Sequence, residues 1–195
     1  HTEETDGCAV DGVEIRVVDD NRHEVPHGQE GEEASRGPQV FVGYWGEPEM
    51  TARALDADGW YYSGDYCRTD SEGRYIRITG RKKDIIVRGG ENISSREVED
   101  IVLEYPGVRE AAVVAMPDER LGERSCACVS MRPGAPAMHL TDLVAFFDGR
   151  RVAKYKFPEY LVVLDALPRT SSGKLQKFAL ARMVRERVAA GQPSD

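Results

Sequence analysis

The sequence contains no apolar run that approaches the roughly 20 residues required by a membrane-spanning helix, so we expect no membrane span. It also lacks an excess of basic residues, because 26 Lys and Arg stand against 34 Asp and Glu and give a net charge of -8 at pH 7. Domains that bind nucleic acid usually carry a basic surface. We therefore do not expect a nucleic acid as a partner.

Cysteine is scarce, and no two cysteines form a CxxC pair. A zinc site or a disulfide framework is therefore not expected, and a reducing cytoplasm is the expected compartment. Cys126 and Cys128 alternate along an expected strand, so their side chains would face the same side as small apolar groups. The four histidines have no ligand-like spacing, and we expect no metal site.

The chain does not begin with Met and shows no signal-like segment at its start. This favours a piece of a longer protein. Residues 191–195 are small and polar and are expected to form a disordered tail.

The first eighty residues predict a small, mostly β unit. Alternating apolar and charged residues predict a strand over 13–17, and an apolar run predicts another over 40–42. Residues 22–38 are polar and predict a loop, and Pro48 opens a short expected helix. Asp58-Gly59 is a hairpin signal before the aromatic run 60–62, and a further strand is expected around 75–79.

The pattern changes after residue 84. Apolar residues at helical spacing predict helices over 98–105, 140–147 and about 175–188. Apolar runs predict strands over 108–116, 125–131 and 160–164. Because helices alternate with strands and short turns also join strands, this half is expected to be α+β.

The stretch from Gly80 to Glu99 joins the two halves. A basic turn is followed by the β-branched run 85–87, which predicts a strand. Gly89-Gly90 predicts a tight turn, since glycine alone enters positive φ without steric cost. Ser94 and Glu97 stand at the spacing of a capping box and predict the start of a helix.

A second motif, Pro-Arg-Thr-Ser-Ser-Gly-Lys-Leu, covers residues 168–175. It is not a Walker A loop, because Pro168 replaces the first glycine and Leu175 replaces the Ser or Thr. We expect Lys174 to precede a helix directly, where its ammonium could stabilise charge on a carboxylate that attacks a phosphate. The alternative is a solvated loop lysine.

Two further residues could contact a nucleotide. Asp65 follows a glycine turn and could accept both hydroxyls of a ribose, although it could equally cap that turn. The Arg81 guanidinium could fork onto a ribose or a phosphate, or it could pair with Asp84 on the surface.

The motifs Ser63-Gly64-Asp65, Gly80-Arg81-Lys82-Lys83-Asp84 and residues 168–174, in this order, resemble those of the adenylate-forming superfamily. That superfamily contains acyl-CoA synthetases, adenylation domains of peptide synthetases and firefly luciferases. Ala34 and Ser63 depart from its pattern without removing a proposed ligand.

The resemblance implies a role for each matching residue. Asp65 would bind the ribose, Arg81 would contact the nucleotide, and Lys83 would be the hinge of a small mobile domain. Gly89 and Gly90, otherwise only a hairpin turn, would border the tunnel for the pantetheine arm. Lys174 would be catalytic in adenylation and could be a site of regulatory acetylation.

The resemblance also implies an AMP-forming acyl-CoA ligase that uses ATP, coenzyme A and a carboxylic acid, with a fatty or other hydrophobic acid expected. Mg²⁺ would accompany ATP without a ligand in this chain. Residues 1–82 would end the large AMP-binding domain, and residues 83–190 would form the mobile C-terminal domain. The phosphate loop and the Tyr-Gly-x-(Thr/Ser)-Glu motif are missing, so we expect the chain alone to be inactive.

Alternatives stay open at this stage. Lys154-Tyr155-Lys156-Phe157-Pro158 favours coenzyme A over a carrier protein as the thiol. Loading of a carrier protein, luciferase-type oxidation and a non-catalytic binding or regulatory module are the other readings. The sequence favours no particular oligomeric state.

Overall fold

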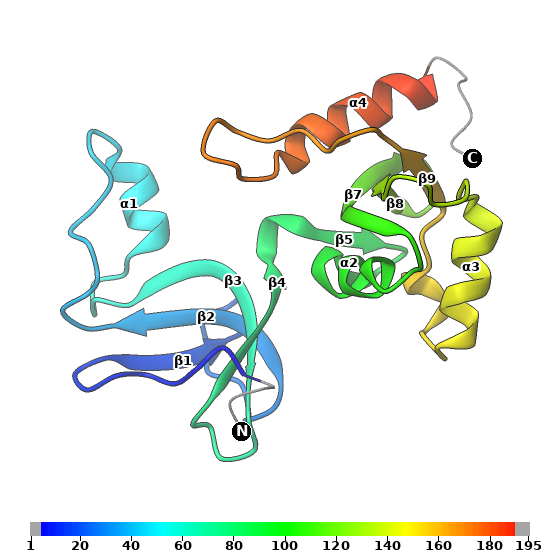
Figure 1. Cartoon of the computed structure of the whole chain (residues 1–195). Coiled ribbons are helices and arrows are strands. Elements are labelled where there is room, and N and C mark those ends of the chain that lie inside the picture. The colour runs from blue at the N-terminus through cyan, green and yellow to red at the C-terminus, as the bar shows by residue number, and fades with distance from the viewer. Residues whose placement is uncertain (1–4, 190–195) are drawn as a thin grey trace. The chain divides into compact units, whose positions relative to one another are not determined.

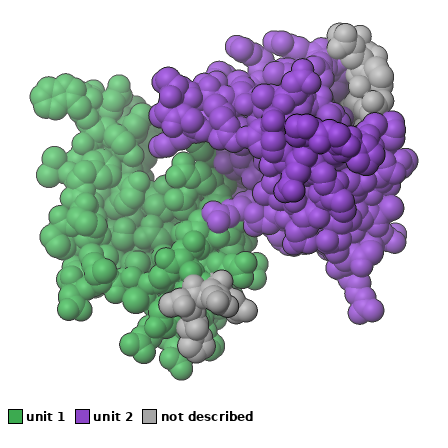
Figure 2. All heavy atoms as spheres, viewed as in Figure 1, with its two compact units in different colours: residues 1–83 green, residues 84–195 purple. Residues whose placement is uncertain are grey.

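The computed structural model describes residues 5–189, and the chain divides into two compact units, residues 1–83 and 84–195 (Figure 2). The expected disordered tail, 191–195, lies outside the described residues. No helix within the described range is long and apolar enough to cross a membrane.

The first unit is a four-stranded antiparallel sheet with one short helix (Figure 1). The strands β1 (Glu14–Val18), β2 (Glu30–Arg36), β3 (Tyr61–Thr69) and β4 (Ile76–Arg81) are neighbours in chain order. Helix α1 (Pro48–Ala54) has Pro48 at its start, as predicted. The small core of this unit consists of Val18, Ala34, Trp60 and Tyr62.

Two of the sequence predictions for this unit are wrong. Residues 30–36, expected in a loop, form β2 and pair with both β1 and β3. Residues 40–42, expected in a strand, have no strand structure, and Val42 is fully exposed. The polar sequence of β2 hides its role because its two buried positions hold only Gly31 and Ala34. At Gly31 a Cβ atom would overlap the carbonyl oxygen of Val18, so the sheet requires glycine there.

The second unit is built on a five-stranded sheet. Its strands are β5 (Ile85–Arg88), β6 (Glu91–Ser94), β7 (Val108–Asp118), β8 (Gly122–Met131) and β9 (Tyr160–Val163). The order is β6-β5-β8-β7, and β9 pairs with β8 in the parallel direction. The short 3₁₀ helix η1 (Lys82–Asp84) lies at the boundary of the units, and a second one, η2 (Lys154–Lys156), precedes β9.

Helices cover both faces of this sheet (Figure 1). One core cluster joins α2 (Ser95–Leu103) and α3 (Leu140–Gly149) to one face, through residues such as Val102, Val113 and Phe147. The other joins α4 (Lys177–Ala189) to the opposite face, through residues such as Leu180. Because side chains alternate along a strand, neighbouring residues of β7 and β8 supply the two clusters.

Most predictions for the second unit are confirmed, including its three helices, its α+β class and the common direction of Cys126 and Cys128, which are buried beneath α4. Ser94 is the N-cap of α2, and its hydroxyl accepts the N–H of Glu97 at 3.4 Å. The Glu97 carboxylate pairs with Lys156, at 2.6 Å from its Nζ.

Candidate functional site

Asp65 and Arg81 lie opposite each other on β3 and β4. The Nε of Arg81 is 2.7 Å from Oδ1 of Asp65, so the alternative in which Arg81 pairs with Asp84 is wrong. The backbone turns at Gly64, whose φ is +74°, and the N–H of Asp65 donates to the Ser63 hydroxyl at 3.1 Å. The arginine side chain is 58% exposed, so one carboxylate holds a guanidinium at a surface that a ligand can reach.

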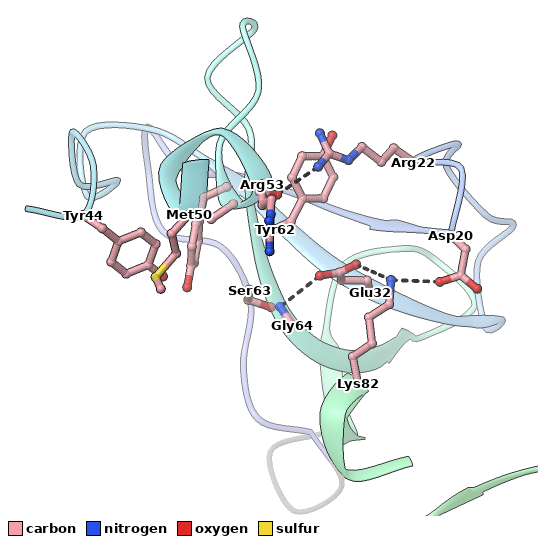
Figure 3. A pocket seen from close by; sticks show the side chains of 12 residues that line it. Asp20, Arg22, Glu32, Tyr44, Met50, Arg53, Tyr62, Ser63, Gly64 and Lys82 are labelled. Atoms are coloured by element: carbon pink, nitrogen blue, oxygen red, sulfur yellow. Dashed lines mark hydrogen bonds and ion pairs between the residues drawn. The ribbon is translucent and has the colours of Figure 1, made fainter. Parts of the chain in front are cut away.

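A hollow of about 390 Å³ lies beside this turn (Figure 3). Glu32 of β2 organises one wall, because its carboxylate accepts the Gly64 N–H at 3.0 Å and the Lys82 ammonium at 3.1 Å. Lys82 also lies 2.8 Å from Asp20, and the hydrogen bonds to the two carboxylates raise the pKa of Lys82 to about 12. Sequence reasoning missed Glu32, since its strand was expected to be a loop.

Lys83 is exposed and lies in η1. It is the last residue of the first unit. The next residue, Asp84, is anchored within the second unit. Its carboxylate is 3.7 Å from the Lys177 ammonium, and its backbone oxygen accepts a hydrogen bond from the Ser95 hydroxyl. The predicted hinge is therefore adjacent to a fixed point of the second unit.

Gly89 and Gly90 form the exposed turn between β5 and β6, with φ of +60° and +91°. The Gly89 N–H donates to the carbonyl of Leu121 at 2.7 Å, which ties this turn to the β7–β8 turn. No Cβ could be added at Gly90 without backbone strain, although the surrounding space is open.

Lys174 lies at the end of a small hairpin. The backbone N–H groups of Thr170 and Gly173 donate to the carbonyls of Lys174 and Thr170 at 2.8 and 2.9 Å. The Lys174 N–H in turn donates to the Thr170 hydroxyl at 3.0 Å, while the side chain is exposed. Helix α4 begins at Lys177, so the prediction that Lys174 directly precedes the helix is wrong.

A partly buried ion pair that the sequence did not suggest lies at the start of α4. The Lys177 ammonium is 2.7 Å from Oε1 of Glu99, which also accepts the Val113 N–H at 2.7 Å. Burial raises the pKa of the Glu99 carboxyl, although Lys177 opposes the rise. This pair fastens the first residue of α4 to α2.

Within residues 5–189 no group of three or more His, Cys, Asp or Glu side chains is arranged to hold a metal ion. All four cysteines are free thiols. Burial raises the pKa of Cys67 to about 12, so this thiol is a packing group with little thiolate character.

Residues 97–174 match the family described as the AMP-binding enzyme C-terminal domain. The matched region ends at Lys174, and most of its residues belong to the helix-covered sheet of the second unit. Residues 97–174 thus correspond to the C-terminal domain of AMP-binding enzymes, while residues 1–96 lie outside the matched region.

Particular relatives have similar sequences or structures. The medium-chain fatty-acid–CoA ligase of Escherichia coli is 65% identical over 94% of this chain, which spans 32% of that protein. A salicylyl-CoA synthase / salicylate adenylyltransferase of a Streptomyces species is 44% identical over 88% of this chain and 31% of its own length. The crystal structure of ATP-bound MatB from Rhodopseudomonas palustris matches 94% of this chain and 36% of its own, with a TM-score of 0.86 and 35% identity. The chain thus spans about a third of the length of these relatives.

Proposed function

We propose that the protein carrying this chain is an AMP-forming acid–thiol ligase that joins a medium-chain fatty acid to coenzyme A. The observation that carries the proposal is the 65% identity, over 94% of the chain, to a medium-chain fatty-acid–CoA ligase. ATP and the acid would first give an acyl-adenylate and pyrophosphate. Coenzyme A would then take the acyl group and release AMP.

Asp65 and Arg81 are proposed to hold the nucleotide. A carboxylate beside a glycine turn can accept the two ribose hydroxyls, and the 2.7 Å pair with Arg81 holds that carboxylate in one orientation. The guanidinium is exposed enough to donate a further hydrogen bond to the ligand.

Lys174 is proposed as the catalytic residue of the first half-reaction. The fatty-acid carboxylate would attack the α-phosphorus of ATP and displace pyrophosphate, which concentrates negative charge at the phosphate. The Lys174 ammonium is exposed on a hydrogen-bonded hairpin, so it is available to form an ion pair with the phosphate oxygens of the ligand. The same exposure supports Lys174 as a candidate for acetylation.

The second half-reaction, thioester formation, is assigned to the Gly89-Gly90 turn of the second unit. Residues 1–82 would end the large domain, and residues 83–190 would rotate about Lys83 to replace Lys174 by the Gly89-Gly90 turn. Glycines leave room for a pantetheine arm beside the backbone. The coenzyme A thiol would then attack the acyl carbonyl, and AMP would leave.

Mg²⁺ would accompany ATP as its counter-ion, and we assign no residue of this chain to it, because residues 5–189 offer no cluster of ligands. The cytoplasm, which holds ATP and coenzyme A, is the proposed compartment.

The test is a panel of carboxylic acids with the whole gene product that carries this sequence. Pyrophosphate release and acyl-CoA formation are measured with octanoate, decanoate, palmitate and salicylate, each with ATP and coenzyme A. Octanoate and decanoate should give the highest kcat/KM for acyl-CoA. Absence of AMP formation with every acid would overturn the proposed activity. The 195-residue chain serves as a control and should give no ATP–pyrophosphate exchange.

An aromatic acid is the second candidate substrate. It is favoured by the 44% identity to a salicylyl-CoA synthase / salicylate adenylyltransferase. A preference for salicylate in the same panel would select it. Transfer of the acyl group from the adenylate to the pantetheine thiol of an added carrier protein, with release of AMP, in preference to coenzyme A would select carrier loading.

A further inference from the structure

Two arginine–carboxylate pairs in the second unit each hold one of the loops assigned above. The first pair fixes the hairpin of Lys174, and the second fixes the Gly89-Gly90 turn. Both carboxylates come from parts of the chain distant from the loops that they hold. They belong to β7 and to the residue before β9.

The hairpin of Lys174 is fastened through Arg169. One guanidinium nitrogen donates to the Gly173 carbonyl at 2.8 Å, and another forms an ion pair with Glu110 of β7. The other oxygen of Glu110 accepts the Ser130 hydroxyl at 3.0 Å. The Arg169 hydrogen bond also holds the pKa of the Glu110 carboxyl below its ordinary value. Glu110 thus links the sheet to the residue immediately before Lys174.

The Gly89-Gly90 turn is fastened through the preceding residue, Arg88. Its Nε and terminal nitrogen lie 2.8 and 2.9 Å from the two oxygens of Glu159, a fork that fixes the guanidinium in orientation as well as distance. The side chains of Arg88 and Glu159 are 25% and 21% exposed, so solvent screens this pair only partly.

Further contacts close a ring around this turn. Glu159 also lies 3.5 Å from Arg124, which is 2.5 Å from Asp118. Asp118 accepts the Leu121 N–H at 2.8 Å, and Leu121 accepts the Gly89 N–H. The turn is therefore held from both sides, through Arg88 and through Leu121.

We propose that Glu110 and Glu159 are positioning residues for opposite half-reactions: Glu110 acts through Arg169 on Lys174, and Glu159 acts through Arg88 on the Gly89-Gly90 turn. The proposal rests on the proposed function. We assign neither carboxylate a contact with a substrate. Each acts by keeping one loop in a single geometry, so loss of one pair affects only the chemistry at its own loop.

The test uses E110Q and E159Q in the whole gene product. Adenylation is followed by ATP–pyrophosphate exchange, and thioester formation is followed from preformed acyl-adenylate and coenzyme A. E110Q should lower kcat of adenylation roughly ten- to a hundredfold and leave thioester formation within about twofold, because small misplacements of a reacting group can cost about a hundredfold. E159Q should give the reverse pattern. E104Q is the matched control, since Glu104 forms a 2.9 Å ion pair with Arg150, away from both loops in sequence.

Hydrogen exchange supplies a readout that does not depend on activity. E110Q should speed exchange of the Gly173 and Gln176 amides about tenfold and leave the Gly89 amide unchanged, and E159Q should do the opposite. Equal loss of both half-reactions in either variant, or exchange that spreads over the whole unit, would show a general structural role and overturn the proposal. If the wild-type protein catalyses neither half-reaction, the proposed function is overturned instead. Hydrogen exchange that changes only in the expected segment of each variant would still support the structural role of the Arg169–Glu110 and Arg88–Glu159 pairs.

Discussion

The ion pair between Lys177 and Glu99 makes a quantitative prediction about the second unit. Replacing Lys177 by methionine keeps all but the last atom of the side-chain length and leaves the Glu99 carboxylate, whose side chain is 14% exposed, without its cation. Breaking a buried pair in this way typically costs about 3–5 kcal/mol. Because Glu99 keeps the hydrogen bond from Val113, we expect a loss of about 2–3 kcal/mol in the free energy of unfolding of this unit.

The chain offers an internal control for this measurement. Both tryptophans, Trp45 and Trp60, lie in the first unit, whereas three of the four α-helices found within residues 5–189 lie in the second. In urea, far-UV circular dichroism should follow the second unit, and tryptophan fluorescence should follow the first. With a slope of roughly 1–2 kcal/mol per molar urea, K177M should lower the dichroism midpoint by about 1–3 M and leave the fluorescence midpoint unchanged.

The effect should also depend on pH in a defined direction. The pKa of Glu99 is already raised by burial, and removal of Lys177 removes a cation that lowers it. A folded-state pKa above the unfolded value means that stability is lost as pH rises through the folded pKa. K177M should therefore be more destabilising at pH 8 than at pH 5, and the double variant E99Q/K177M should recover most of the loss. A cost below about 1 kcal/mol, no pH dependence, or no recovery would refute the reasoning.

Three further predictions follow from single positions. K174A should lower adenylation about a hundred- to a thousandfold without changing the unfolding midpoint, because the side chain is exposed; a shifted midpoint would point to a structural role. G90V should spare pyrophosphate exchange and lower thioester formation at least tenfold, and the opposite split would remove the tunnel assignment. G31A should destabilise the first unit by about 1–3 kcal/mol in the fluorescence transition, since its Cβ would overlap Val18. G149A is the control, because a Cβ atom at Gly149 meets nothing within 4 Å. It should leave the urea midpoints of both the dichroism and the fluorescence transition unchanged.

The sequence was sufficient where structure depends on neighbours along the chain. Adjacent glycines predicted the turn at Gly89-Gly90, and apolar residues at helical spacing predicted α2, α3 and α4. The three motifs that point to adenylate-forming enzymes are each contiguous, so no tertiary information was needed to find them. The α+β class followed from the same local signals.

Local signals failed where pairing overrides propensity. The polar segment 30–36 became a sheet strand because β1 and β3 supply hydrogen bonds on both sides, and its buried positions need small residues. The apolar residues 40–42 have no such partners and stay outside the sheet. Propensity for a strand is mostly a statement about packing against neighbours, which a single segment does not contain.

The sequence alone determined which residues are candidates for the chemistry: Asp65, Arg81, Lys83, Gly89, Gly90 and Lys174. The tertiary structure decided what holds them. Glu159 is 71 residues from Arg88, and Glu110 is 59 residues from Arg169, so neither pair leaves a pattern in the sequence. The physical reason is that a charge pair depends on distance in space, and only folding brings such distant side chains within hydrogen-bonding range.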